Sequence, residues 1–265
     1  MQNNNLSNNN YKIRHVENGL NEKWIAWIDK NLQRKCDIEE IKKILQKTFS
    51  THHQIDQILS NRFSFQKTVK QIKFPTEKLN LHLIKNFLTE KECQDIIQAA
   101  NGHFVPSTIT SQTTEKDLYF RTSSTCHYTN LGKEGKKVLD KIDNKICNYL
   151  QLSSEFGEFV QIQHYVRGNE FKLHHDFFDT TSAKEMEKQG NRTWTFMVFL
   201  NNVERGGETY FKTINVKFQP EQGMALLWHN LNADGSPNYN TMHAGLPIVA
   251  GEKYIITKWF REMPL

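Results

Sequence analysis

The sequence lacks any apolar run long enough to cross a membrane, which takes about 18 uninterrupted residues. No basic stretch followed by an apolar one stands at the N-terminus, so no secretory signal is indicated. Lys and Arg number 34 against 29 Asp and Glu, but the excess is spread along the chain without a dense basic tract. We therefore expect a cytoplasmic protein with neither a membrane nor a nucleic-acid partner.

Cysteine is also scarce, with four residues in the whole chain. No two of them form a Cys-x-x-Cys pair, which excludes the usual zinc-ribbon and thioredoxin-like motifs. We expect reduced and mostly buried thiols. The four are Cys36, Cys93, Cys126 and Cys147.

The N-terminal quarter has a composition unlike the rest. Residues 1–19 begin with an asparagine-rich stretch without apolar periodicity, which predicts a disordered leader. From residue 20 to 75, apolar residues recur with helical spacing, as in Trp24, Trp27 and Ile28. We expect a small helical module there, whose role the sequence does not define.

Residues 76–265 are expected to form a mainly β domain with flanking helices. Thr89 and Glu92 form a capping box that opens one helix, and a second is predicted over 133–150. After Phe159, short β-rich runs alternate with glycine, proline and asparagine. Seven or eight such strands fit a jelly-roll barrel, a double-stranded β-helix, with space for a ligand at its mouth. Two long polar connections, 179–192 and 230–241, are candidate substrate loops.

His174 and Asp176 are two residues apart in a predicted strand, so their side chains should share one face while His175 points away. His243, 67 residues beyond Asp176, is the best candidate for a third ligand. Two histidines and one carboxylate form the facial triad of non-haem iron(II), which leaves coordination positions open. The same set also serves catalytic zinc, so a hydrolase is an alternative.

Lys253 follows His243 by ten residues on the next predicted strand. A lysine that faces a barrel interior needs an anion, because an unpaired buried charge is costly. The distal carboxylate of a 2-oxoacid would supply one. The hydrolase alternative leaves this lysine unexplained.

The region from Leu79 to Arg261 resembles the prolyl 4-hydroxylase group of iron(II)- and 2-oxoglutarate-dependent oxygenases. Three segments carry the resemblance. They are Tyr165-x-x-Gly168-x-x-Phe171-x-x-His174-x-Asp176, the turn Gly206-Gly207-Glu208-Thr209, and His243 to Trp259 with Gly251-Glu252-Lys253. The resemblance implies Fe(2+) bound by His174, Asp176 and His243, 2-oxoglutarate bound by Lys253, and ascorbate as the reductant.

The resemblance also implies roles for three other residues. Tyr165 would lie near the cosubstrate and Thr195 on a strand lining the pocket, while Arg121 matches a segment that precedes a substrate-covering loop. The sequence departs from the pattern at Phe171 and Phe199, where relatives carry tyrosine. Without a tyrosine hydroxyl at position 199, Lys253 is then expected to contribute more to binding the distal carboxylate of the cosubstrate.

The expected function is hydroxylation of a prolyl residue in a peptide or protein, with Trp228 and Tyr239 as candidate walls of a groove for an extended chain. One alternative is the same chemistry on another side chain or a small metabolite. A second is a non-catalytic metal-binding barrel that acts as an interaction module. The oligomeric state stays open.

Overall fold

The computed structural model describes residues 24, 27–28, 30–31, 38–49, 55, 70–73, 76, 78–108, 120–179, 186, 189–232 and 234–265. It divides into two compact units, 1–68 and 69–265, which we describe separately. Among the described residues, no helix combines the length and the apolar composition needed to cross a membrane.

The first unit contains helix α2 (Ile38–Thr48) and further helical residues at 24, 27–28, 30–31 and 55. Its core is made by the apolar residues with helical spacing: Ile28, Ile41, Leu45 and Ile55 are buried, with Trp24, Trp27 and Phe49 packed against them. The apolar stripe is therefore a packing face. The expected leader, residues 1–19, lies outside the described residues.

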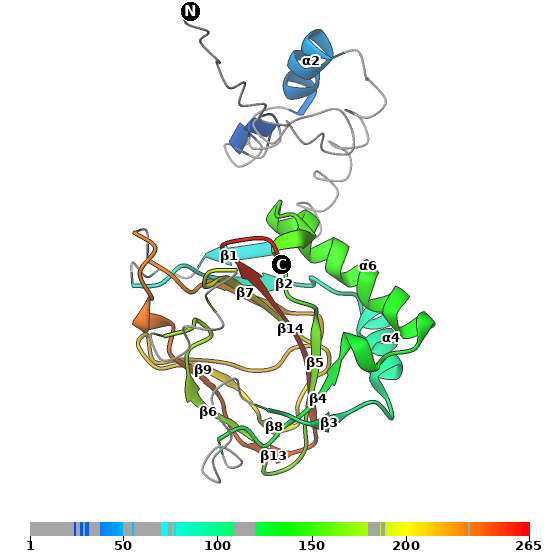
Figure 1. Ribbon diagram of the computed structural model, residues 1–265, viewed down its shortest axis with the longest axis vertical. Coiled ribbons are helices and arrows are strands. Elements are labelled where there is room, and N and C mark those ends of the chain that lie inside the picture. The colour runs from blue at the N-terminus through cyan, green and yellow to red at the C-terminus, as the bar shows by residue number, and fades with distance from the viewer. Residues whose placement is uncertain are drawn as a thin grey trace, which may run out of the picture. The chain divides into compact units, whose positions relative to one another are not determined.

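The second unit is built on an eight-stranded antiparallel sheet in the order β1-β2-β11-β7-β14-β5-β4-β3 (Figure 1). Non-adjacent parts of the sequence meet in it: β14 lies between β7 and β5, and β11 between β2 and β7. The strand bounds are β1 Lys70–Lys73, β2 Leu81–Lys85, β3 Val105–Pro106, β4 Ser124–His127, β5 Gln161–Tyr165, β7 Arg192–Phe199, β11 Ala225–His229 and β14 Lys253–Arg261.

A four-stranded sheet in the order β10-β9-β12-β6 faces the large one, and a two-stranded sheet pairs β13 with β8. Side chains from both larger sheets form one apolar cluster that includes Phe211 and Trp228. The bounds are β6 Phe171–His174, β8 Arg205–Gly206, β9 Thr209–Phe211, β10 Val216–Phe218, β12 His243–Gly245 and β13 Ile248–Ala250.

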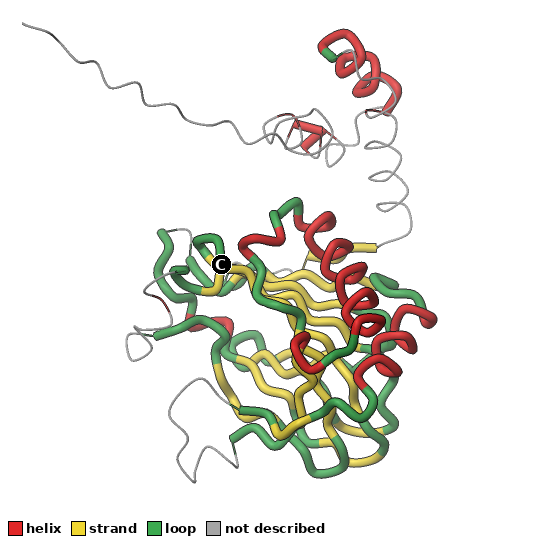
Figure 2. Tube along the Cα trace, turned by 45° about the vertical axis from the view of Figure 1, so that its right-hand side comes forward, coloured by secondary structure: helices red, strands yellow, loops and turns green. Residues whose placement is uncertain are grey.

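Helices α4 (Glu90–Ala100) and α6 (Lys133–Leu150) lie together on one side of the large sheet (Figure 2). The ring of Tyr149 on α6 packs edge-on against Phe196 of β7 at 5.9 Å. Buried Lys258 of β14 reaches α6 through an ion pair with Asp143, 2.5 Å from Nζ to Oδ1. With its outer face covered in this way, the large sheet leaves its inner face for a site.

The predicted architecture, mainly β with flanking helices, is confirmed. α4 begins after Thr89 with both hydrogen bonds of the capping box in place, and α6 covers the predicted range. β1 lies within the range expected for the helical module, and the predicted domain limits stay a prediction. Of the two polar connections, 230–241 is described apart from residue 233, whereas most of 179–192 lies outside the described residues.

Candidate metal centre

Strand pairing brings the two histidines together. β12 runs antiparallel to β6, and the register places His243 directly opposite His174. Their ring centroids are 4.2 Å apart. Residues separated by 69 positions in the sequence therefore meet through backbone geometry, and both side chains point between the sheets.

Each histidine has one ring nitrogen engaged by the backbone. Nδ1 of His174 lies 2.6 Å from the carbonyl oxygen of Lys172, and Nδ1 of His243 lies 2.9 Å from that of Thr241. A carbonyl only accepts, so each Nδ1 carries the proton and each Nε2 keeps its lone pair. This is how the protein orients imidazoles that bind a metal.

Asp176 supplies the carboxylate. Its Oδ1 lies 3.8 Å from Nε2 of His174 and its Oδ2 lies 3.9 Å from Nε2 of His243. Ligand atoms of the three residues all lie within 4.8 Å of one another, and within the described residues they are the group whose atoms could hold a metal ion. The donor set suits iron(II) and leaves half of an octahedral shell for other ligands.

Asp176 does not lie on the strand that was predicted to carry it. β6 ends at His174, and Asp176 follows in a bend. His174 and Asp176 do approach the same point, but alternation along one strand, the predicted reason, does not explain it. The Thr195 hydroxyl of β7, which itself accepts a hydrogen bond from Asn230, contacts the carboxylate instead.

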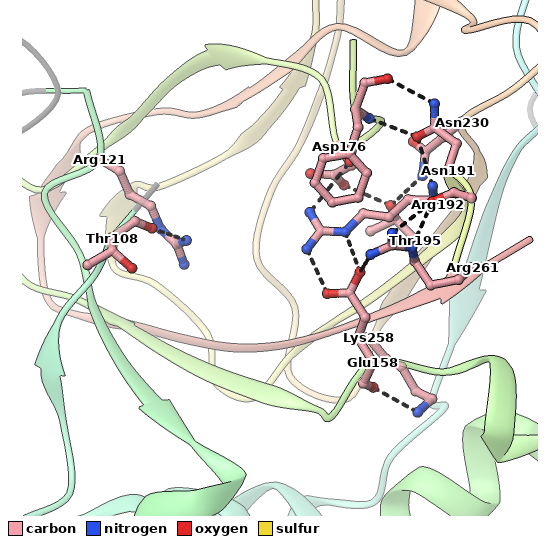
Figure 3. Close-up of polar contacts among 12 residues, drawn as sticks. Thr108, Arg121, Glu158, Asp176, Asn191, Arg192, Thr195, Asn230, Lys258 and Arg261 are labelled. Atoms are coloured by element: carbon pink, nitrogen blue, oxygen red, sulfur yellow. Dashed lines mark hydrogen bonds and ion pairs between the residues drawn. The ribbon is translucent and has the colours of Figure 1, made fainter. Parts of the chain in front are cut away.

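A buried chain of hydrogen bonds holds the carboxylate from behind. The Thr195 hydroxyl lies 2.7 Å from Oδ2 of Asp176, and Nδ2 of Asn230 donates to the same hydroxyl at 2.9 Å (Figure 3). Thr195 and Asn230 are each 0% exposed. Because Asn230 donates to the hydroxyl, the hydroxyl proton must point at Asp176, so this chain favours an ionised carboxylate.

The backbone of Asp176 is held as well. Arg192 contacts its carbonyl oxygen at 3.4 Å and makes two hydrogen bonds to the carboxylate of Glu158, at 2.7 and 2.6 Å. The guanidinium stacks over Trp259, 4.0 Å from the ring centroid. Arg261 also reaches Glu158, at 3.2 Å (Figure 3). A shared, partly buried ion-pair network of this kind stabilises the segment that presents Asp176.

The electrostatics agree with metal binding. Burial, with the neighbouring His243, lowers the pKa of His174 to about 3, so its imidazole is neutral near pH 7. Burial by itself would raise the pKa of Asp176, but His243, His174 and Arg192 hold it below its ordinary value. A neutral imidazole and an ionised carboxylate are the forms that bind metals.

Lys253 lies in the same pocket and is 2% exposed. Its Nζ donates to the carbonyl oxygen of Gly207 at 2.7 Å and lies over the rings of Tyr165 and Phe199, at 5.2 and 5.6 Å. No carboxylate among the described residues lies within 4.0 Å of Nζ, and burial lowers its pKa to about 7. A bound anion would stabilise this ammonium.

The turn at Gly206 and Gly207 presents the carbonyl oxygen that accepts the hydrogen bond from Lys253. Gly206 and Gly207 both have positive φ, +80° and +73°. A Cβ on Gly206 would lie 2.4 Å from the Pro247 carbonyl oxygen, and one on Gly207 would lie 2.5 Å from Cδ1 of Ile248. Both positions therefore require glycine.

The structure gathers most of the predicted site residues. The pocket is lined by His174, Asp176, His243, Lys253, Tyr165, Arg121 and Trp228. Thr195 lies behind Asp176 and is not among the lining residues. Tyr239 is 65% exposed and packs on His175 and Phe177, whose side chains point away from the metal site.

Other lining residues were not singled out from the sequence: Gln163, Met197, Thr209, Ile255, Thr257 and Trp259. Four of them could have been found by alternation, because they share a strand face with Tyr165 on β5 or with Lys253 on β14. Arg192 and Asn230 carried no such signal, since they act on Asp176 from other elements.

A barrel with two histidines, a carboxylate and a buried lysine around one pocket defines the class of iron(II)- and 2-oxoglutarate-dependent oxygenases. A model of the 2OG-Fe(II) oxygenase superfamily matches residues 160–261. The chain is 32% identical over 196 residues to probable prolyl 4-hydroxylase 3 of Arabidopsis thaliana, with 66% of each chain covered. It is 30% identical over 184 residues to a putative prolyl 4-hydroxylase of Acanthamoeba polyphaga mimivirus, with 68% of this chain and 73% of the relative covered.

A solved structure is also similar. The viral collagen prolyl hydroxylase of Paramecium Bursaria Chlorella virus-1, in complex with 2OG, superposes with a TM-score of 0.52 at 27% identity. The match covers 74% of this chain and 97% of that one. The chain therefore belongs to the prolyl 4-hydroxylase family, and its jelly-roll fold is confirmed.

The geometry predicts that alanine at His174, Asp176 or His243 abolishes iron(II) binding, because two remaining ligands cannot hold the ion in an open site. Isothermal titration under anaerobic conditions measures this directly. His175→Ala is the matched control and should bind iron normally, since Nε2 of His175 contacts the Tyr239 carbonyl oxygen and is not part of the metal-ligand group. The assignment would be contradicted if His175→Ala lost iron while the alanine variants of His174, Asp176 and His243 kept it.

The hydrogen bond from Thr195 generates a second prediction. Thr195→Val keeps the shape of the side chain but removes the hydroxyl. Loss of a hydrogen-bond partner of a metal ligand typically lowers metal affinity about 10–100-fold, so we expect the iron affinity of Thr195→Val to fall by this factor. Thr195→Ser keeps the hydroxyl and should retain most of that affinity. Equal iron affinities for the valine and serine variants would show that the hydroxyl does not position Asp176.

Proposed function

We propose that the protein is a dioxygenase that hydroxylates prolyl residues in a peptide or protein, with Fe(2+) held by His174, Asp176 and His243 and 2-oxoglutarate held by Lys253. The observation that carries the proposal is a single pocket lined by the three metal ligands and by one buried lysine. Membership of the prolyl 4-hydroxylase family supports proline as the target. A catalytic zinc site would leave the lysine without a role.

When bound, iron and 2-oxoglutarate supply the oxidative chemistry: 2-oxoglutarate and dioxygen are consumed, succinate and carbon dioxide are released, and one oxygen atom enters a C–H bond. The residues of the chain position the reactants. Lys253 orients the cosubstrate by its distal carboxylate. Apolar walls such as Met197, Ile255 and Trp228 exclude water from the reacting centre.

The open side of the pocket suits an extended substrate. Arg121 lines it, with its guanidinium 4.9 Å from the ring of Phe171 and a hydrogen bond from Nε to Ser123 at 3.1 Å. The buried indole of Trp259 also lines the pocket and packs against the guanidinium of Arg192. A flat aromatic wall and a donor-rich rim fit a polyproline II segment, which is already extended before it binds. We keep Arg121 and Trp228 as proposed substrate contacts; Tyr239 would meet only an outer part of a long peptide.

Ascorbate as the reductant stays a prediction from the family resemblance.

The choice between a prolyl peptide and another side chain or small metabolite is tested by incubating the iron-loaded enzyme with short proline-rich peptides. Mass spectrometry should find one added oxygen on proline, with succinate formed in equal amount. Oxygen found on non-proline residues or free metabolites alone would contradict the prolyl assignment but not the oxygenase class. A non-catalytic barrel would release no succinate.

Lys253→Met should raise the KM for 2-oxoglutarate about 10–100-fold, because it removes one charge-assisted hydrogen bond to the cosubstrate. Iron affinity should stay unchanged, since Lys253 does not contact the metal ligands. Steady-state kinetics and iron titration together separate the two effects. A KM equal to that of the wild type would remove the lysine from the cosubstrate site.

The pKa of Lys253 adds a pH test. With a pKa of about 7, the lysine is charged below that pH and loses its proton as the pH rises through it. The affinity of the iron-loaded enzyme for 2-oxoglutarate should therefore weaken above pH 7, by up to about tenfold per unit. Lys253→Met should lose this dependence and bind weakly at every pH.

A further inference from the structure

Gln163 is a polar residue in the pocket to which the proposed chemistry gives no role. It lies on the inner face of β5, two residues before Tyr165, and is 3% exposed. A carboxamide so deeply buried is expected to be hydrogen-bonded at both ends, because each unpaired polar atom costs free energy. One end of Gln163 is paired and the other is not.

The paired end is the carbonyl. The Thr257 hydroxyl on β14 donates to Oε1 of Gln163 at 3.2 Å, and Thr257 is itself buried in the pocket wall. This bond fixes the orientation of the amide. Nε2 of Gln163 donates to no residue that the structure describes, so a fixed N–H donor is left on the wall of the cavity.

The position of this donor distinguishes it from the cosubstrate contact. On β5, Tyr165 stands opposite Lys253, while Gln163 stands one same-face step away, about 7 Å along the strand. On its other side Gln163 pairs with Thr125 of β4, whose hydroxyl takes a hydrogen bond from Arg121 at 3.3 Å. Gln163 thus lies between the buried lysine and the arginine at the more open side of the pocket.

A prolyl segment has a particular need for such a donor. Proline has no backbone N–H, so its backbone offers a protein only carbonyl oxygens, which must be met by donors from the protein. In an extended polyproline II segment these carbonyls are free of internal hydrogen bonds. An oriented amide N–H inside the pocket matches that requirement, whereas an apolar residue at the same place would not.

We propose that Nε2 of Gln163 donates a hydrogen bond to a backbone carbonyl oxygen of the substrate peptide next to the target proline, with Thr257 holding the amide in position. The inference rests on the proposed prolyl function and adds a specificity-determining residue to it. Gln163 contributes to peptide affinity and leaves iron and 2-oxoglutarate binding to the residues already described.

The test uses Gln163→Met, which keeps the length of the side chain but removes the amide. Gln161→Met is the matched control, because Gln161 is on the same strand and is not among the residues that line the pocket. Each enzyme is loaded with Mn(2+) and 2-oxoglutarate without oxygen, and a proline-rich peptide hydroxylated by the wild type is titrated in. Gln163→Met should weaken the peptide Kd by roughly two- to tenfold, the effect of one hydrogen bond, with the Kd for 2-oxoglutarate unchanged.

Two further variants keep the test decisive. Thr257→Val should weaken peptide binding less than Gln163→Met, since the amide remains but is no longer fixed. Gln163→Glu keeps the side-chain shape and replaces the donor by an acceptor, so it should weaken the peptide at least as much as Gln163→Met; it also serves if the methionine variant fails to fold.

An unchanged peptide Kd in both Gln163 variants would overturn the inference. A weakened Kd for 2-oxoglutarate with an unchanged peptide Kd would overturn it too, because the acceptor would then belong to the cosubstrate. A wild-type enzyme that neither binds nor hydroxylates any proline-rich peptide would overturn the proposed function first, and the two failures are therefore distinguishable.

Discussion

The antiparallel pairing of β12 with β6 is the constraint on which the site depends. It sets His243 opposite His174, so that two residues far apart in sequence present ring nitrogens to one point. A slip of one residue would turn one of the two histidines to the other face of the sheet. β9 pairs with the other side of β12 and aligns Phe211 with His243, which holds the register from both sides.

Once the histidines are placed, the charges of the site are arranged by burial. Asp176 and Lys253 are both buried, and each would be costly to bury alone. Asp176 has its charge stabilised within the chain, by the Thr195 hydroxyl and the nearby histidines and Arg192. Among the residues that the structure describes, Nζ of Lys253 hydrogen-bonds to a neutral carbonyl oxygen, that of Gly207. The carboxylate of Asp176 is therefore available to a metal cation and the ammonium of Lys253 to an anion, and this difference is the basis on which we propose that Lys253 binds the cosubstrate.

The sequence was sufficient for features that depend on local patterns. The capping box at Thr89 and the apolar side of 133–150 placed both helices. The two-residue spacing suggested that His174 and Asp176 meet, although Asp176 lies beyond the end of β6 and is held by other contacts. The contacts that hold Asp176 could not be predicted, because Arg192 reaches its carbonyl oxygen from β7 and Asn230, just after β11, acts on it through the Thr195 hydroxyl. The position of Thr195 shows the same limit: its strand was predicted, but its distance from Asp176 depends on how the sheet packs against the bend after β6.

Two polar side chains on the inner face of the large sheet, Thr195 and Gln163, show how a common barrel becomes specific. Thr195 and Gln163 are both buried, and both have one hydrogen bond that fixes the direction of a second. For Thr195 the second bond ends on Asp176 within the chain. For Gln163 no described residue takes it. A fixed donor that faces the pocket without an internal acceptor is available to an acceptor on a bound molecule. A hydrogen bond from this donor would favour substrates that place a carbonyl oxygen at that position. Substrates without a carbonyl oxygen there would bind without this contribution.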